Sequence, residues 1–526
     1  MCGRGRTTLT EQRMEAALLI CCCVVFISWV FTVKVGYAIW WRPRVLGKQL
    51  EKQGIRGPPY KLLYGNVKEI NKLNQEAISK PMGHSHQIVP RIFPFFLETV
   101  QNYGKICVTW FGETPRVIIM DTELIKDILS DKFGHFAKPP VNPLVILLAQ
   151  GLALAEGEKW ARQRRIINPA FHMEKLKGML PEFARCCKEM VERWEKLVGE
   201  DGNFEIDVLP ELQNLTVDVI SRTAFGSSFE EGKRIFELQQ EQADLCIQAV
   251  RIIYIPGFRF VPTEKNMRRK KIHKKVRGII QELIQKKETE IKSGTLYNHD
   301  LLGLLLESNN TNDNKSKLTL DDVIEECKLF YFAGQETTST LLTWTMVVLS
   351  MHPTWQQRAR DEVMQVIGSQ YTYLPTLEQL SHLKIVNMIL NEVLRLYPPG
   401  PLLLRQTYKR ISLRGIDFPA GVELALPVIM IHHDRELWGD DADEFQPTRF
   451  SDGVSKASKH PFAFFPFGGG PRICIGQNFA LIEAKMVLAM VLMKFSFHLS
   501  PLYTHAPCQQ LTLQPQHGAP IILHKL

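Results

Sequence analysis

The chain has 526 residues, of which 45% are hydrophobic and 23% charged, and its formal net charge is +9 at pH 7. This composition excludes an intrinsically disordered chain, which lacks the apolar residues needed for a core. The mild positive charge suits an anionic membrane surface or an acidic protein at least as well as a nucleic acid. The 11 cysteines include no CxxC pair, so neither a disulfide framework nor a structural zinc site is predicted.

Residues 16–41 are predicted to form a transmembrane anchor. No charge interrupts the sequence from Ala16 to Val33, and the apolar run reaches Trp41 if Lys34 extends its amine to the headgroups. About 20 apolar residues span a bilayer. The alternative is a cleaved signal peptide, but the run is long for one and no A-x-A site follows it. Basic residues are denser after the run, which predicts a cytosolic body.

The segments around the anchor divide the chain further. Residues 1–15 are predicted to be an N-terminal extension, and Met14 leaves the start site open between two methionines. Residues 42–60 are basic and rich in proline, which disfavours helix, and predict a hinge between membrane and body. Residues 61–526 contain no long linker or repeat and are predicted to form one domain.

Helical periodicity dominates this domain. Apolar residues recur every three or four positions in EFARCCKEMVERWEKLV, KKVRGIIQELIQKKETEI and TWQQRARDEVMQVI, whereas strand-like runs such as PRVIIM and APIILHKL are few. The fold class is therefore predicted to be mainly α with small β-sheets. The basic cluster at residues 268–275 runs into an amphipathic helix, so we interpret it as a solvated helix face and expect no nucleic-acid partner.

The first candidate site residues lie in EKWARQRR. Trp160 and Arg164 are four apart on one predicted helical face, where an indole N–H and a guanidinium can meet one acidic group. In NEVLRLYPPG, Glu392 and Arg395 are three apart, a spacing common in any exposed helix. Each pattern is weak evidence alone.

Between these two patterns, residues 317–352 are predicted to form one long helix. Thr319 begins a capping-box pattern, and about 33 residues at 1.5 Å each give roughly 50 Å, enough to cross the domain. Gly334 in its middle costs about 1 kcal/mol against alanine, and the close approach of a flat ligand is one reason for it. Glu336 and Thr337 then offer an acid beside a hydroxyl, which suits proton delivery. The alternative for Thr337 is a hydrogen bond to its own helix.

The strongest pattern is F-x-x-G-x-R-x-C-x-G, formed by Phe467, Gly470, Arg472, Cys474 and Gly476. Its glycines allow unusual backbone conformations and let a flat macrocycle come close. Backbone N–H groups at the start of the following helix favour an anionic sulfur, and the arginine supplies a cation for a carboxylate. A buried cysteine in a tight turn is the alternative, but it does not require all five residues.

In their order and spacing, W-x-x-x-R, A-G-x-E-T-T, E-x-x-R, F-x-P-x-R-F and F-x-x-G-x-R-x-C-x-G make the chain resemble a membrane-bound cytochrome P-450, a haem-thiolate monooxygenase, from the anchor to Leu526. The resemblance implies the cytochrome P-450 fold behind a single transmembrane helix and haem b as the cofactor. It also implies an endoplasmic reticulum membrane protein whose catalytic domain faces the cytosol.

The resemblance also assigns roles to residues. Cys474 is then the axial thiolate ligand of the haem iron, which favours O–O cleavage, and Glu336 and Thr337 form the acid–alcohol pair that relays protons. Glu392 and Arg395 form a structural pair, and Thr448 stands where most relatives carry a glutamate. The other implied positions are Arg472, Trp160, Arg164 and Arg405 for the propionates, Phe467 and Gly476 for the rest of the haem site, and Arg449 for completion of the structural triad.

No G-x-G-x-x-G motif follows a strand, so the resemblance implies electrons from a separate NADPH-cytochrome P-450 reductase. Lys159, Arg162 and Arg165 are predicted to belong to the basic surface that meets it.

Segments such as WFGETPRVIIMD, LRLYPPGP and LQPQHGAPIILHKL resemble the plant 72 clan, near its secologanin-synthase-like and triterpenoid-oxidising members. This implies hydroxylation or stepwise oxidation of a lipophilic terpenoid, foremost an oleanane-type triterpenoid of saponin biosynthesis; iridoids such as loganin, and gibberellins or steroids, are alternatives. Apolar residues 143–151, 250–260 and 402–404 are expected to line the pocket and its opening, and the turn at Pro256 to enter the membrane.

Two other classes of function remain as alternatives. A haem-thiolate isomerase or dehydratase uses no oxygen, and a haem sensor performs no catalysis. Neither requires an acid–alcohol pair, so the presence of Glu336 and Thr337 favours a monooxygenase.

Overall fold

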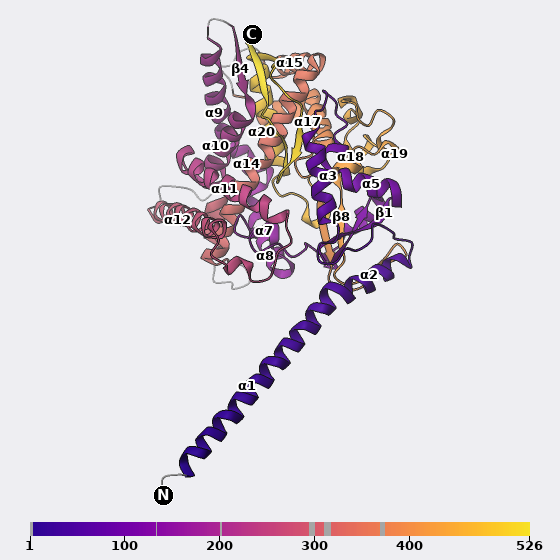
Figure 1. Ribbon diagram of the computed structural model, residues 1–526. Coiled ribbons are helices and arrows are strands. Elements are labelled where there is room, and N and C mark those ends of the chain that lie inside the picture. The colour runs from indigo at the N-terminus through magenta and orange to yellow at the C-terminus, as the bar shows by residue number, and fades with distance from the viewer. Residues whose placement is uncertain (1–3, 133, 200–201, 294–299, 310–316, 369–373) are drawn as a thin grey trace.

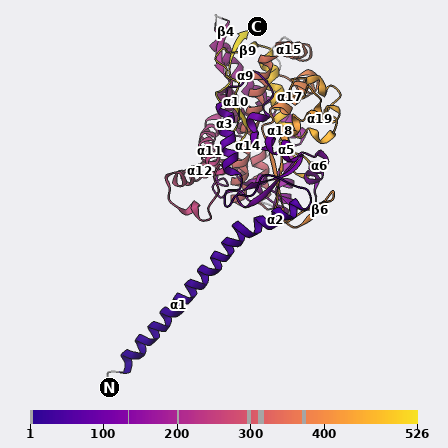
Figure 2. The same cartoon turned by 45° about the vertical axis from the view of Figure 1, so that its right-hand side comes forward.

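The computed structural model describes residues 4–132, 134–199, 202–293, 300–309, 317–368 and 374–526. A long N-terminal helix projects from a mainly helical body, as two views show (Figures 1 and 2). Helix α1 (Arg4–Gly36) continues through a π-helical turn (Tyr37–Trp41) into α2 (Arg42–Glu51). Residues 16–51 are helical, and none of the residues in their apolar window of mean hydropathy 2.7 is buried, so by length and composition this helix can cross a membrane.

The proline-rich region expected as a hinge is helical in its first half. Pro43 lies in the first turn of α2, directly after the π-helical turn, and the Ile39 carbonyl one turn earlier accepts a hydrogen bond from the Tyr60 hydroxyl (2.5 Å). The chain leaves the helix after Glu51 and reaches α3 through Gly57-Pro58-Pro59. The division between anchor and body at these positions stays a prediction.

Helices form most of the body. Their bounds are α3 Val67–Ser79, α4 Val89–Ile92, α5 Pro94–Tyr103, α6 Thr122–Ser130, α7 Gly151–Leu154, α8 Gly157–Ile167, α9 Met173–Val198, α10 Val208–Phe225, α11 Phe229–Val250, α12 Glu264–Lys292, α13 Leu301–Asn309, α14 Leu320–Met351, α15 Pro353–Ile367, α16 Leu377–His382, α17 Lys384–Leu396, α18 Val428–His432, α19 Arg435–Trp438 and α20 Gln477–Leu492.

The strands form small sheets, as expected. The largest has the order β1-β2-β8-β5-β3, and β4-β12-β9, β10-β11 and β6-β7 form the others. Their bounds are β1 Ile106–Phe111, β2 Thr114–Ile119, β3 Phe136–Ala137, β4 Asn203–Asp207, β5 Leu403–Thr407, β6 Ile411–Leu413, β7 Ile416–Phe418, β8 Glu423–Leu426, β9 Phe495–Leu499, β10 Pro507–Gln509, β11 Leu513–Pro515 and β12 Pro520–Lys525. The runs PRVIIM and APIILHKL supply β2 and β12.

Helix α14 is the centre of the core. It packs against α10, α17 and α20, and nearly every residue from Gln335 to Leu349 is buried. The predicted capping box is present: the Asp322 N–H donates to Thr319 Oγ1 (3.1 Å), and the Thr319 N–H donates to Asp322 Oδ2 (3.2 Å). The helix ends before Pro353, as expected from the sequence.

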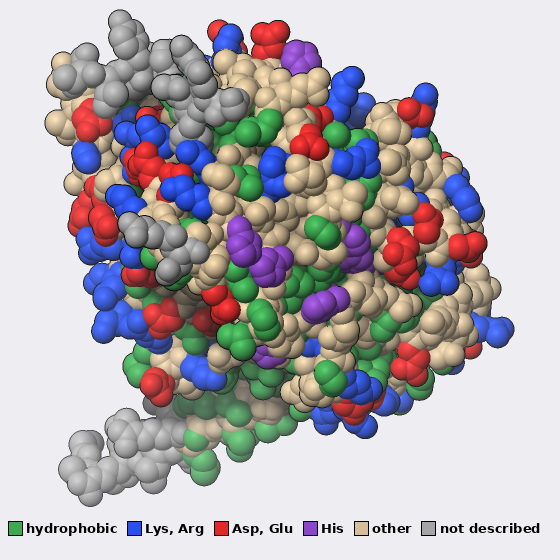
Figure 3. All heavy atoms as spheres, turned by 90° about the horizontal axis from the view of Figure 1, so that it is seen from above, with side chains coloured by type: hydrophobic (Ala, Val, Ile, Leu, Met, Phe, Trp, Pro, Cys, Tyr) green, Lys and Arg blue, Asp and Glu red, His purple; other side chains and the backbone are tan. Residues whose placement is uncertain are grey.

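The surface opposite α1 has the character of an ordinary solvated face. Seen from above, acidic and basic side chains are interspersed there, without a large field of one sign (Figure 3). A membrane or partner surface with a strong charge of one sign is therefore expected on another face of the body.

Candidate active site

A short loop before α20 holds Cys474. A 3-10 turn (Gly470–Arg472) precedes Cys474, and the Cys474 backbone N–H donates to the carbonyl of Phe467 (2.9 Å). Gly476 occupies the N-cap of α20, so the sulfur lies at the positive end of that helix dipole. The Cys474 side chain is exposed, although α20 buries most of its residues.

Three effects act on the thiol. Burial of its surroundings raises the pKa of Cys474, while the Gly476 N–H and the charge of Arg164 act in the opposite direction. Arg164 is fixed beside the loop, because its Nη1 donates to the carbonyl of Ile473 (2.9 Å). Two of the three effects favour a thiolate, but burial outweighs them and the pKa of Cys474 is raised overall.

The two glycines of the motif serve different purposes. Gly470 has φ +65°, and a Cβ there would lie 2.0 Å from the carbonyl oxygen of Leu129, so both conformation and space require glycine. Gly476 has φ −88°, which any residue adopts. The expectation of an unusual backbone at Gly476 was therefore wrong: a Cβ there would lie 4.0 Å from the Cys474 sulfur, and glycine keeps the space beside the sulfur open.

Arg472 and Trp160 come together, although they are far apart in the sequence. The Arg472 guanidinium lies over the Trp160 ring, 4.6 Å from its centroid. It also donates to the Ala155 carbonyl (3.0 Å) and pairs with Glu156. Trp160 and Arg164 both project from α8, so this one helix contacts the Cys474 loop through two side chains.

Arg405 extends this cluster from β5, and its companion Lys138 belongs to no motif of the sequence. Burial and the neighbouring Arg472 lower the pKa of Arg405 to about 10. Burial, Arg405 and Arg472 lower the pKa of Lys138 to about 8. Glu156 is the carboxylate that acts on all three cations, so the cluster carries an excess of positive charge in a poorly hydrated place. Such a cluster is suited to binding further carboxylates.

Glu336 and Thr337 are neighbours on α14 but face different surroundings. Glu336 is buried, and its Oε1 accepts hydrogen bonds from Thr512 Oγ1 and Gln514 Nε2, each at 2.7 Å. Burial raises the pKa of Glu336, and the hydrogen bond from Thr512 lowers it. Thr337 donates to the Ala333 carbonyl one turn earlier (2.8 Å), the alternative considered for it, yet its side chain is exposed within a buried helix. It therefore lines an open space.

Gly334 is not explained by the approach of a flat ligand. A Cβ at this position would lie 2.9 Å from the side chain of Ile220 on α10. The glycine thus allows α10 and α14 to pack closely, and this contact is invisible to local sequence patterns.

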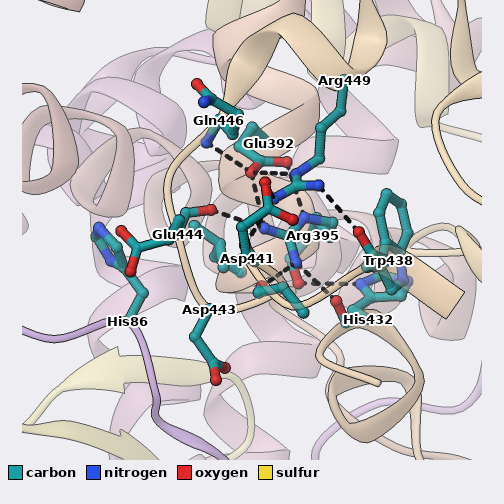
Figure 4. Close-up of polar contacts among 12 residues, drawn as sticks. His86, Glu392, Arg395, His432, Trp438, Asp441, Asp443, Glu444, Gln446 and Arg449 are labelled. Atoms are coloured by element: carbon teal, nitrogen blue, oxygen red, sulfur yellow. Dashed lines mark hydrogen bonds and ion pairs between the residues drawn. The ribbon is translucent and has the colours of Figure 1, made fainter. Parts of the chain in front are cut away.

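The E-x-x-R pair forms the centre of a buried network (Figure 4). Arg395 donates to both carboxylate oxygens of Glu392 (2.7 and 2.8 Å), and both side chains are fully buried. Arg395 also donates to the carbonyls of His432, Ala442 and Glu444 at 2.6–3.0 Å. The pair is therefore satisfied entirely by protein groups.

Arg449 lies beside this pair, and its role as third member of a structural triad stays a prediction. Its Nε lies 3.6 Å from Glu392 Oε1. Arg449 is also paired with Asp441 (2.7 Å) and donates to the Trp438 carbonyl (3.0 Å). Neighbouring groups of the loop thus supply the contacts that hold this arginine.

Four features of the described residues fit a haem. A cysteine at a helix N-terminus, an open space lined by Thr337, a cluster of cations suited to carboxylates and a glycine that brings the loop close are the features this group requires. Residues 81–521 match the family described as Cytochrome P450. The chain belongs to this family of haem-thiolate monooxygenases, whose cofactor is haem.

Within the family, the chain belongs to the plant 72A group. It is 59% identical over 505 residues to cytochrome P450 CYP72A616 of Paris polyphylla, covering 95% of this chain and 97% of the relative. It is 53% identical to cytochrome P450 CYP72A219 of Panax ginseng, with 96% and 97% covered. The 11-oxo-beta-amyrin 30-oxidase of Glycyrrhiza uralensis is 52% identical, with 93% and 94% covered.

A solved structure shows the same fold. The retinoic acid-bound cyanobacterial CYP120A1 superimposes with a TM-score of 0.73 over 90% of this chain and 99% of its own, at 24% sequence identity. The predicted fold class, mainly helical with small sheets, is confirmed.

Proposed function

We propose that this enzyme hydroxylates or stepwise oxidises a pentacyclic triterpenoid. The observation that carries the proposal is a mainly apolar cavity of about 230 Å³ whose wall includes Phe93, Phe95, Phe96, Phe111 and Leu402, with Asn71, Arg116 and Gln509 among its polar members. Flat aromatic and branched side chains suit a rigid hydrocarbon skeleton. The relative from Glycyrrhiza uralensis, named for the oxidation of a β-amyrin derivative, supports the same class.

The three segments that were expected to line the substrate pocket do not all line the same cavity. Val250 and Leu402 line the mainly apolar cavity. Of residues 143–151, Leu147, Gln150 and Gly151 instead line a polar cavity of about 490 Å³ with Asp321 and other charged residues. The part of this segment around Leu148 packs toward α11 and belongs to a small apolar cluster.

An exposed apolar surface beside the cavity supports delivery of a lipophilic substrate from the bilayer. Two segments, residues 62–64 and 250–261, contribute to this surface. A Cβ on Gly112 would lie within 4.0 Å of both Leu63 and Ile253, so the two segments lie close together. Exposed apolar patches of this kind commonly mark membrane surfaces. The exposed residues are Leu62, Leu63, Tyr64, Val250, Ile252, Ile255, Phe260 and Val261.

The same surface supports the proposed location. The apolar helix and the exposed patch support a single-pass anchor in the endoplasmic reticulum membrane with the catalytic body in the cytosol. Electrons would come from NADPH through a separate reductase. Among the three cations expected at that interface, Arg165 is exposed and Lys159 is exposed but paired with Asp322 (2.7 Å), whereas Arg162 is half-buried.

Bound haem would supply oxygen activation. In the proposed arrangement, Cys474 would hold the iron, and the propionates would be held by Arg472, Arg405, Lys138, Trp160 and Arg164. Phe467 and Gly476 shape the loop around the sulfur. Glu336 and Thr337 would deliver protons, and for this the exposed Thr337 hydroxyl can turn from its helix.

The test is product analysis from yeast that co-expresses this chain with a plant reductase and is fed oleanane triterpenes, loganin or gibberellin precursors. A Cys474→Ser variant is the matched control. We expect a hydroxylated or carboxylated triterpene that is absent with the variant. Conversion of loganin or a gibberellin alone would contradict the triterpenoid assignment and move the enzyme to another branch of the same chemistry.

A further inference from the structure

Glu336 is held by a segment of chain almost 180 residues away. Thr512 joins β10 to β11, and Gln514 lies within β11. Both donate to Glu336 Oε1 at 2.7 Å, from Thr512 Oγ1 and Gln514 Nε2, and all three side chains are buried. A third hydroxyl, that of Thr340, lies 3.2 Å from Thr512 Oγ1 and joins helix and hairpin.

The two donors share one carboxyl oxygen and leave the other free. Glu336 Oε2 is buried and makes no hydrogen bond within the part of the chain that the structure describes. Two bonds to Oε1 fix the orientation of the carboxyl plane. Oε2 is then the atom that carries the acidic proton, and the negative charge left after its release is stabilised at Oε1.

We propose that Thr512 and Gln514 are positioning residues for the Glu336 carboxyl: they fix its orientation and stabilise its anion, so that Oε2 can release and regain a proton. In that step the O–H bond at Oε2 breaks, the proton passes toward the active site, and a proton from solvent water replaces it. This inference rests on the proton-delivering role proposed for Glu336.

The same hairpin also forms part of the substrate cavity. Gln509, Gln510 and Leu511, at its tip, line the apolar cavity described above. Leu511 directly precedes Thr512, so a molecule that fills the cavity contacts the segment that holds the carboxyl. The hairpin therefore links the presence of substrate to the orientation of Glu336.

The experiment measures the carboxyl itself. Infrared difference spectra of the haem-loaded protein are recorded across a pH titration, and the band of protonated Glu336 is assigned by its loss in Glu336→Gln. Thr512→Val and Gln514→Leu each remove one donor while roughly keeping the side-chain volume. We expect the band to shift in both variants and the carboxyl to stay protonated to higher pH, because its anion has lost a hydrogen bond.

Two control variants separate the hydrogen bond from packing. Thr512→Ser keeps the hydroxyl and is expected to restore the wild-type band. Thr345→Val removes a buried hydroxyl of α14 that donates only to its own helix (Leu341 carbonyl, 2.8 Å), and is expected to leave the band unchanged. An unshifted band in Thr512→Val and Gln514→Leu, failure of Thr512→Ser to restore it, or unfolding of both donor variants would overturn the proposal.

A second readout separates this inference from the role of Glu336. With an oleanane substrate that the wild type oxidises, hydrogen peroxide released per NADPH consumed is expected to rise severalfold in Thr512→Val and Gln514→Leu, because protons arrive late. A shifted band with unchanged peroxide release would support positioning by the hairpin and contradict proton delivery by Glu336.

Discussion

The Cys474 loop and the network around Arg395 differ in how their polar groups are satisfied. Every charge of the Glu392–Arg395 pair has protein partners, with short hydrogen bonds and complete burial. Near Cys474, cations outnumber carboxylates, and the cysteine side chain is exposed. A structural network uses its full bonding capacity within the chain, whereas a binding site keeps part of that capacity for its ligand.

The largest effect is expected where the satisfied network is broken. Arg395→Ala leaves the buried Glu392 carboxylate without its main partner and is expected to lower the free energy of unfolding by about 3–5 kcal/mol. Lys72→Ala removes an exposed pair with Glu76 and is expected to change it by no more than about 0.5 kcal/mol. Denaturant unfolding of both variants measures the difference. Equal losses would contradict the distinction between buried and exposed pairs.

The second-largest loss of stability is expected at Gly470, and Gly476 in the same loop is its control. Gly470→Ala combines a left-handed backbone with a collision at the Leu129 carbonyl and is expected to cost about 2–4 kcal/mol, with loss of haem during purification. Gly476→Ala places a methyl group at ordinary distances from Phe171 and the Cys474 sulfur and should retain the fold. The haem-to-protein ratio and the thermal midpoint of each variant provide the check, and a fold lost in Gly476→Ala alone would reverse the assignment.

A smaller effect is expected from the excess cations. Arg405→Gln removes one buried positive charge without a large change in volume. If these cations hold the propionates, haem dissociates several times faster from the variant, while its apo form is as stable as the wild type or more so, because a charge with lowered pKa is no longer buried. Transfer of haem to an acceptor protein measures the rate. An unchanged rate would remove Arg405 from the haem site.

The smallest effect is a pH dependence. Burial and neighbouring cations lower the pKa of Lys138 to about 8, so its charged form is disfavoured in the apo protein. A bound carboxylate raises that pKa, so haem binding takes up a proton above pH 8 and haem affinity falls as the pH rises through this region. Lys138→Met should abolish this part of the pH dependence. Identical pH profiles for wild type and variant would contradict it.

Local sequence patterns predicted the elements well and the long-range contacts poorly. The capping box at Thr319 and the strand at the C-terminus were confirmed, because each depends on neighbours in sequence. The same patterns placed Gly334 beside a ligand, whereas Ile220 of another helix fills that space. A helical glycine looks the same in both cases.

For the site, too, local motifs were predicted and long-range contacts were not. The motifs identified Cys474, whereas Lys138 went unnoticed because a single lysine after a two-residue strand has no local signature. Glu336 was expected to act with its neighbour Thr337, but its hydrogen-bond partners lie on a hairpin near the C-terminus. Only the folded chain brings these groups together.

The most direct test of the central claim is the absorption spectrum of the reduced protein with carbon monoxide, recorded for wild type and Cys474→Ser. If the exposed Cys474 sulfur ligates the iron, the wild type shows the strongly red-shifted Soret band of thiolate-ligated haem, and the variant does not. A Soret band of that kind in Cys474→Ser, or its absence from a haem-loaded wild type, would show that the polar groups around Cys474 serve another purpose.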